Sequence, residues 1–437
     1  MNTSTSKHIL RKLVAFSIPL ILSGLLQQLF NWVDALIVGN IIGEAALAGI
    51  GTTSSLYNLF VTVLVGFTSG LTVLFAQQYG KGEESENKYL LTGYTVILCI
   101  IFTVIAAVGM IFISTLLGLL DTPENLLEYA RQYLFVIFMG IPFLAVYNTY
   151  SAALRGMGNS KTPFAAVLIS SATNGILDFV FIAICGFGVW SAAAATVISQ
   201  VAMTIFIVVF THIRYPQLRF SLNEWGRCIG AIKSGGTYAV PPAVQSSVTS
   251  VGNIFLQRFM NGFGEQTVAA ITTSYRVDTV LLLPIFNLTT AISTIVAQET
   301  GAGNHREAKK ALKIGTVLMA IMSLGLTAVI IVFGKSVLSI FGLTSGAVTI
   351  GSEFFKRIAM FYVIFGVANS IKGYLEGTSD MLFSGVIGIC SLGVRLIGSY
   401  ALADVFGNMV IAYAEAIAWV FLLIACFARY KMRGRTK

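Results

Sequence analysis

Charge is scarce in this chain of 437 residues: Lys, Arg, Asp and Glu make up 11% of it, against about 25% in a typical soluble protein. Hydrophobic residues make up 56% and the mean hydropathy is +0.82, which excludes a soluble enzyme. The five cysteines form no CxxC or Cys/His spacing, so no disulfide framework or structural metal is predicted. The sequence also lacks a Walker A segment and the DDxxD, GxGD and HExxH motifs. ATP-driven transport and an intramembrane enzyme are therefore not expected, nor is a cofactor.

Twelve apolar runs are present, each close to or above the roughly 20 residues that a helix needs to cross a bilayer. They are 14–38, 47–75, 89–117, 133–154, 164–184, 191–210, 240–259, 268–296, 314–333, 354–371, 381–402 and 409–427. The runs are continuous rather than alternating, which favours helices over the strands of a β-barrel. The first run is about twice the length of a signal-peptide core, so we expect it to remain as a span.

The 28 Lys and Arg exceed the 19 Asp and Glu, which gives a net charge of +9. The basic residues lie between apolar runs rather than on one face, so the charge indicates membrane orientation and not nucleic-acid binding. Alternate loops are much richer in Lys and Arg, for example the loop with Arg306, Lys309, Lys310 and Lys313. Because positively charged loops stay on the cytoplasmic side, both termini are predicted to be cytoplasmic.

An internal duplication is visible at a single offset of 221 residues. Segments 43–48, 76–82 and 154–159 match segments 264–269, 297–303 and 375–380. Each half then holds six helices and enters from the same side, so the repeat is parallel, with a pseudo-twofold axis along the membrane normal. The predicted fold is an all-α integral membrane protein with two six-helix lobes, 1–210 and 234–437. A cytoplasmic linker at 211–233 joins the lobes around a central cleft.

Two acidic residues, Asp34 and Asp178, lie inside predicted spans of the first half. An ionisable group there costs at least about 2.5 kcal/mol, and no basic residue lies within the cores of these six spans. Two carboxylates without a basic partner bind protons or a metal cation, which predicts a cation-coupling site. The alternative is that backbone groups or water in a wet cleft satisfy both acids.

Two neutral side chains support a coupling site. Asn174 lies one helical turn before Asp178, and Thr196 lies near the middle of the next span. Together with the acids they offer the hard oxygen ligands that Na⁺ accepts, although the spacing does not separate Na⁺ from H⁺. At the offset of 221 the second half holds Phe255, Arg395, Ser399 and Ile417 in place of Asp34, Asn174, Asp178 and Thr196. This pocket is therefore predicted in the first half alone.

The second half carries its own intramembrane charges, Arg276, Asp278, Arg395 and Glu415. They are two cations and two anions, which favours a paired polar network over a role in recognising substrate or ion. Further candidates for the cleft wall are Gln245, Asn253 and Tyr275, with interhelical hydrogen bonding as the equal alternative.

Pro19 lies about four turns before Asp34 in the first span. A proline removes a helix hydrogen bond, so Pro19 is either a conformational hinge or a static bend. Pro241 and Pro242 occupy the matching segment of the second half.

At these residues the chain resembles the multidrug and toxic compound extrusion (MATE) family over its whole length. The likeness rests on Pro19 with Asp34, on segment 154–159 followed by Thr162-Pro163, on Asn174 with Asp178, and on the paired Ala-Gln-x-x-Gly-x-Gly segments. The resemblance implies a V-shaped pair of lobes and an antiporter that binds Na⁺ or H⁺ at Asp34, Asn174, Asp178 and Thr196. Some members of the family carry an additional acidic residue in the seventh span. None is present in 240–259, so the resemblance does not imply a cation site in the second lobe.

The expected function is therefore multidrug efflux by alternating access, with organic, often cationic and amphipathic, compounds as substrates. We expect a monomer in the bilayer of a cell membrane. The runner-up is a flippase for lipid-linked oligosaccharides, which belongs to the same larger group, but such relatives usually have about fourteen spans and a more basic cleft.

Overall fold

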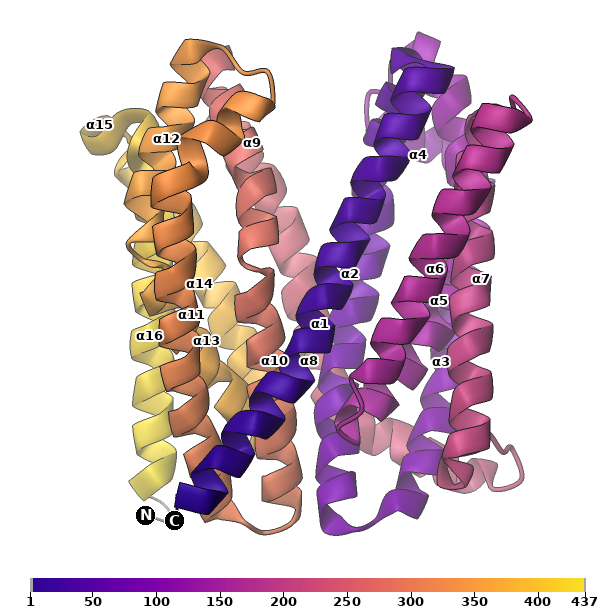
Figure 1. The fold of residues 1–437 in the computed structure, drawn as a ribbon, viewed down its shortest axis with the longest axis vertical. Coiled ribbons are helices and arrows are strands. Elements are labelled where there is room, and N and C mark those ends of the chain that lie inside the picture. Colours follow the sequence, from indigo (N-terminus) through magenta and orange to yellow (C-terminus); the bar gives the residue numbers. More distant parts are fainter. Residues whose placement is uncertain (1–2, 436–437) are drawn as a thin grey trace. The chain divides into compact units, whose positions relative to one another are not determined.

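The computed structural model describes residues 3–435, and helices make up nearly all of them (Figure 1). The first half contains α1 (Thr3–Ile37), η1 (Val38–Ile42), α2 (Glu44–Lys81), α3 (Glu84–Ile111), α4 (Ile113–Leu119), α5 (Glu124–Gly156), α6 (Lys161–Asp178), η2 (Phe179–Ile184), α7 (Val189–Arg214) and η3 (Pro216–Leu218). The second half contains α8 (Trp225–Asn261), α9 (Glu265–Leu281), α10 (Leu283–Gly301), α11 (His305–Ile340), α12 (Ser345–Ala359), α13 (Tyr362–Gly377), α14 (Met381–Ala401), α15 (Ala403–Phe406), η4 (Gly407–Met409) and α16 (Val410–Arg435).

Each predicted apolar run lies in one helix or in consecutive helical segments. Among the described residues, ten helices are long and apolar enough to cross a membrane. The pair α12 and α13, bent by 49°, gives an eleventh if it is counted as one broken span rather than a re-entrant loop. The remaining run, 240–259, lies in α8, where polar side chains such as Gln245 and Asn253 lower the hydropathy. The predicted all-α membrane fold is therefore confirmed.

The chain divides into two compact units, one of residues 18–239 and one of residues 240–435 together with residues 3–17. The divisions fall inside α1 and α8. The lobes predicted at 1–210 and 234–437 stay a prediction, and their residues 1–2 and 436–437 lie outside the described part. The predicted linker, 211–233, contains the end of α7, η3 and the start of α8.

Corresponding helices pack in the same way within the two units. In the first unit α5 packs against α2, α3 and α7, while α6 packs against α7. In the second unit α13 packs against α10, α11 and α16, while α14 packs against α16. One central helix in each unit thus organises the apolar core, which in the first unit includes Leu71, Phe75 and Phe138.

Two glycines at equivalent positions let the central helices approach their neighbours closely. A Cβ atom on Gly156 of α5 would lie 2.5 Å from Phe75 Cβ of α2. A Cβ on Gly377 of α13 would lie 2.7 Å from Val296 Cγ1 of α10. Both pairs of positions are 221 residues apart, so the duplication preserved the helix contact as well as the sequence pattern. Small residues at such contacts are typical of packed membrane helices.

Replacing Gly156 or Gly377 with leucine is expected to lower the melting temperature of the detergent-solubilised protein, because overpacking a close helix contact costs about 1–3 kcal/mol. Gly325→Leu on α11 is the matched control, since an added Cβ there meets open space. Melting temperatures that fall equally in all three variants would contradict this assignment.

Candidate cation site in the first unit

Two short π-helical segments lie beside the predicted coupling acids. Asp34 stands one turn before η1, and Asp178 is the last residue of α6, directly before η2. η1 packs against η2, and both pack against α7. π-Helical turns inside α-helices are rare overall, but those that are present frequently lie at functional sites. The packing of η1 on η2 brings together two acids that lie far apart in the unit's sequence.

The carboxyl groups of Asp34 and Asp178 lie within hydrogen-bonding reach of each other. Asp178 is fully buried, and Asp34 is partly buried. None of the ion pairs formed by the described residues involves either acid. Two adjacent carboxylates repel each other when both are charged, so this arrangement favours a proton or a cation between them.

The neutral side chains predicted for the site also converge there. The Asn174 amide donates a hydrogen bond to Thr196 Oγ1 over 3.3 Å, and the Thr196 hydroxyl donates to the carbonyl of Ala192 over 3.1 Å. These bonds use one N–H of the Asn174 amide and the O–H of Thr196. The Asn174 Oδ1 atom takes part in neither bond. Asp34, Asn174, Asp178 and Thr196 therefore form one cluster built from α1, α6 and α7.

Four buried oxygens of this cluster accept no hydrogen bond within the described part of the chain. They are Asp34 Oδ1, Asn174 Oδ1 and both carboxylate oxygens of Asp178. Leaving buried acceptors unpaired costs free energy, and more when they are charged. The described residues hold no group of three or more His, Cys, Asp or Glu suited to a metal. A cation bound here would thus be held by two carboxylates and neutral oxygens, a donor set that fits Na⁺ better than a transition metal.

Three further polar side chains, which were not predicted from the sequence, extend the cluster. Gln200 lies one turn after Thr196 on α7, and its amide donates to the Tyr57 hydroxyl over 2.8 Å. The Gln200 Oε1 atom is buried without a partner among the described residues. Tyr133 of α5 lies within electrostatic range of both acids. The spacing of four residues between Thr196 and Gln200 is the one signal that pointed to this extension.

Pro19 is buried in the interior of α1, which stays helical from Thr3 to Ile37. The Ser23 hydroxyl donates to the Pro19 carbonyl over 2.8 Å. Pro19 lies two residues beyond the division between the units in α1, and Pro241 lies two residues beyond Ala239, the last residue before the division in α8. Each helix that contributes to both units therefore has a proline, and one fewer backbone hydrogen bond, where it passes from one to the other.

At the equivalent place, the second unit pairs two of its charged side chains with each other. Arg395, which corresponds to Asn174, forms an ion pair with Glu415 over 3.1 Å. The Tyr275 hydroxyl donates to Glu415 over 3.0 Å and accepts from Arg395 over 2.6 Å. Only 17% of the Arg395 side chain and 10% of the Glu415 side chain are exposed. This unit thus carries its own counter-ion where the first unit leaves oxygens open.

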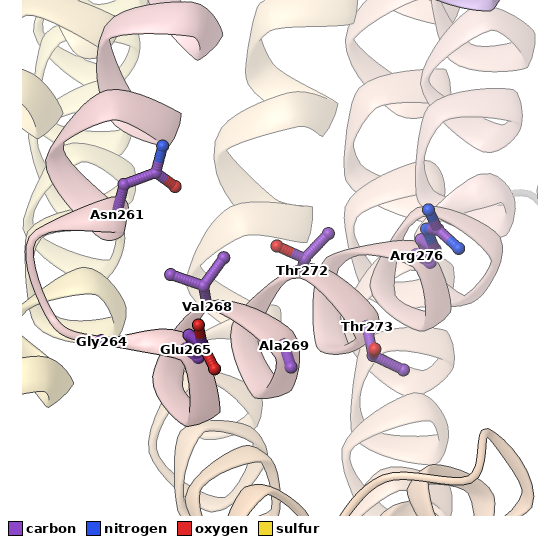
Figure 2. A pocket seen from close by; sticks show the side chains of 8 residues that line it. All are labelled: Asn261, Gly264, Glu265, Val268, Ala269, Thr272, Thr273 and Arg276. Atoms are coloured by element: carbon purple, nitrogen blue, oxygen red, sulfur yellow. The ribbon is translucent and has the colours of Figure 1, made fainter. Parts of the chain in front are cut away.

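Asp278 lies within electrostatic range of that pair but forms no direct bond with it, whereas Arg276 lies at a different pocket. Asp278 is buried and accepts a hydrogen bond from the Tyr362 hydroxyl. Arg276 is exposed and forms no ion pair with a described residue. Figure 2 shows it among the residues of α8 and α9 that line a pocket of about 570 Å³, with Glu265 and Asn261. The structure therefore joins two of the four predicted charges directly and places Arg276 at a separate pocket.

The other polar candidates of the second unit also separate. Gln245 accepts a hydrogen bond from Lys372 over 3.2 Å, and both line a cavity of about 180 Å³ with Arg395 and Glu415. Asn253 is exposed on α8 and does not line this cavity.

Comparisons with known proteins give a consistent picture. A family model described as MatE matches residues 19–180 and 241–401, once in each half. The chain is 28% identical to the probable multidrug resistance protein YpnP of Bacillus subtilis, over 99% of this chain and 97% of that protein. It is 25% identical to the probable multidrug resistance protein NorM of Thermotoga maritima, over 86% and 81%. The crystal structure of a mutant of the Vibrio cholerae MATE transporter VcmN shares the fold, with a TM-score of 0.92 at 19% identity over 100% and 99%.

The buried Arg395–Glu415 pair provides a test of stability. Glu415→Gln leaves the Arg395 charge without a counter-ion, and breaking a buried pair costs about 3–5 kcal/mol. We expect the melting temperature to fall clearly more than in Glu353→Gln. Glu353 is the matched control because its pairs with Lys356 and Arg357 are exposed, where a pair contributes about 0–1 kcal/mol. Equal melting temperatures of the two variants would show that the buried pair does not stabilise the unit.

Proposed function

We propose that this chain, which belongs to the MatE family of membrane transporters, is a secondary active efflux antiporter. It exports organic compounds in exchange for Na⁺ or H⁺. The observation that carries the proposal is the cluster of buried oxygens at Asp34, Asn174 and Asp178, which has no counter-ion from the described chain. Such a cluster binds its cation from solution, so its occupancy follows the ion gradient.

In this mechanism the two acids and two neutral side chains have different roles. Asp34 and Asp178 supply the negative charge that attracts a cation and that a single proton or Na⁺ partly neutralises. Asn174 and Thr196 supply neutral oxygens and, through their mutual hydrogen bond, fix α6 against α7. A bound cation removes the repulsion between the acids and so favours close packing of η1 on η2. Release of the cation restores the repulsion and favours a different arrangement of α1.

The available energy is sufficient for uphill export. One charge that moves through 100 mV yields about 2.3 kcal/mol, which supports a gradient of about fiftyfold before any chemical gradient is added. Binding of cation and of substrate must then favour different conformations, because a ligand shifts an equilibrium only by its differential affinity.

The substrates we propose are organic, often cationic and amphipathic, drugs, in line with the names of the curated relatives. We expect the chain to act as a monomer in the plasma membrane. The distribution of Lys and Arg indicates that both termini lie in the cytoplasm. The names of these relatives favour efflux over transport of lipid-linked oligosaccharides.

Transport in liposomes tests the proposal. We expect export of a fluorescent organic cation under an imposed Na⁺ or H⁺ gradient, and loss of gradient-driven transport in Asp34→Asn and Asp178→Asn. Asp404→Asn is the matched control, because Asp404 is exposed on α15 of the other unit and is not part of the cluster. This variant should transport as the wild type does. Gradient-driven transport that survives in both acid variants would refute coupling at this cluster.

The neutral ligands distinguish the two ions. Na⁺ needs several oxygen ligands, whereas a proton needs a carboxylate alone. With Na⁺ as the coupling ion, Thr196→Val should raise the Na⁺ concentration for half-maximal transport several-fold while the pH dependence stays unchanged. With H⁺ as the coupling ion, the same variant should keep the wild-type dependence on both ions. Rates at graded Na⁺ and graded pH measure the difference.

A further inference from the structure

A second groove of the second unit is lined by α11, α13 and α16 and shares no lining residue with the cavity at Arg395 and Glu415. Its floor is α13, which packs against both α11 and α16. Its volume is about 970 Å³, at the upper end of the range of about 300–1,000 Å³ found for small-molecule sites. Buried residues of the apolar core, among them Leu312 of α11 and Ile371 of α13, close the inner side of the groove.

One end of the groove is strongly basic. Arg306, Lys309, Lys310 and Lys313 all line it. Their spacing of three and four residues places them on one face of α11, within its first three turns. Lys310 forms an ion pair with Glu307 over 2.5 Å. The other three are exposed and form no ion pair with a described residue, so an excess of positive charge faces the groove.

The rest of the groove is apolar and open. Val317, one turn beyond Lys313, is 56% exposed, while Ile424 and Phe427 of α16 are 63% and 45% exposed. Tyr430 closes the α16 wall near the basic end. Figure 1 shows that the start of α11 and the end of α16 lie at the same end of this unit. Cations therefore stand at the ends of membrane-spanning helices, and an apolar channel leads from them toward the middle of the spans.

We propose that this groove binds an anionic phospholipid from the leaflet on the side of the chain termini. The headgroup phosphate contacts Arg306, Lys309 and Lys313, and an acyl chain lies along Val317, Ile424 and Phe427. Both chemistries are required. A soluble phosphate leaves the apolar channel uncovered, and a cationic drug is repelled by the basic end. Basic pockets between membrane helices at the cytoplasmic side suit anionic lipid headgroups, and the long Lys and Arg side chains reach the headgroup region.

Lipid binding in this groove does not depend on the proposed coupling ion, because none of the groove residues belongs to the cluster of Asp34, Asn174, Asp178 and Thr196. It also differs from the bulk lipid that surrounds any membrane protein. Bulk lipid exchanges without preference for charge, whereas this groove should select phosphatidylglycerol over phosphatidylcholine.

Native mass spectrometry of the detergent-solubilised full chain with added lipid tests the selection. We expect phosphatidylglycerol to bind the wild type more tightly than phosphatidylcholine of the same chain length. Arg306→Gln with Lys309→Gln and Lys313→Gln should weaken phosphatidylglycerol binding by about fivefold for each cation, or roughly a hundredfold in total. Lys81→Gln with Lys161→Gln and Arg214→Gln is the matched control: it removes three exposed cations of the first unit and should leave lipid binding unchanged.

A second variant tests the apolar part. Val317→Trp fills the channel and keeps all four cations, so it should also lose phosphatidylglycerol while its melting temperature stays near that of the wild type. Inorganic phosphate alone should not compete with the lipid at millimolar concentration. Equal binding of the two lipids, full binding to the triple variant, or displacement by phosphate would each overturn the proposal.

Discussion

A charged or polar group inside a bilayer must have a partner, and this constraint shapes both units of the protein. Unpaired buried carboxylates are too costly to be kept without a compensating ion or proton. The second unit meets the constraint internally, with Arg395 against Glu415 and Tyr362 against Asp278. The first unit leaves Asp178 and the oxygen of Asn174 without partners from the described chain. In the proposed mechanism a proton or cation from solution completes that site, and its binding couples transport to a gradient.

The duplication explains how one architecture holds two such different interiors. Equivalent helices pack in equivalent ways, and the close contacts at Gly156 and Gly377 recur at the same offset. The scaffold therefore tolerates exchange of the polar residues that project from it. Replacement of an amide at position 174 by a guanidinium at position 395 turns an open ligand set into a closed ion pair.

The cation cluster also lies on an element that both units use. Asp34 belongs to α1, whose residues 3–17 group with the second unit while the rest groups with the first. Pro19 weakens the helix next to this division, and Pro241 does the same in α8. In the proposed mechanism a change at Asp34 therefore acts on a helix that contributes to both units. The basic groove on α11, α13 and α16 contains no residue of this helix, and in our proposal it binds anionic lipid.

The sequence alone predicted the spans, the duplication and the four side chains that the structure brings together at Asp34, Asn174, Asp178 and Thr196. Hydrophobic runs must match the thickness of the bilayer, and intramembrane acids are rare enough to stand out, so both can be recognised along one dimension. The tertiary structure decided which side chains meet, because this depends on how each helix is rotated and where it contains a π-helical turn. It placed η1 against η2, added Tyr57, Tyr133 and Gln200 to the cluster, and set Arg276 and Asn253 apart from the ion pair. These outcomes rest on contacts between residues far apart in the chain, because a side chain finds its partner only after the helices have packed.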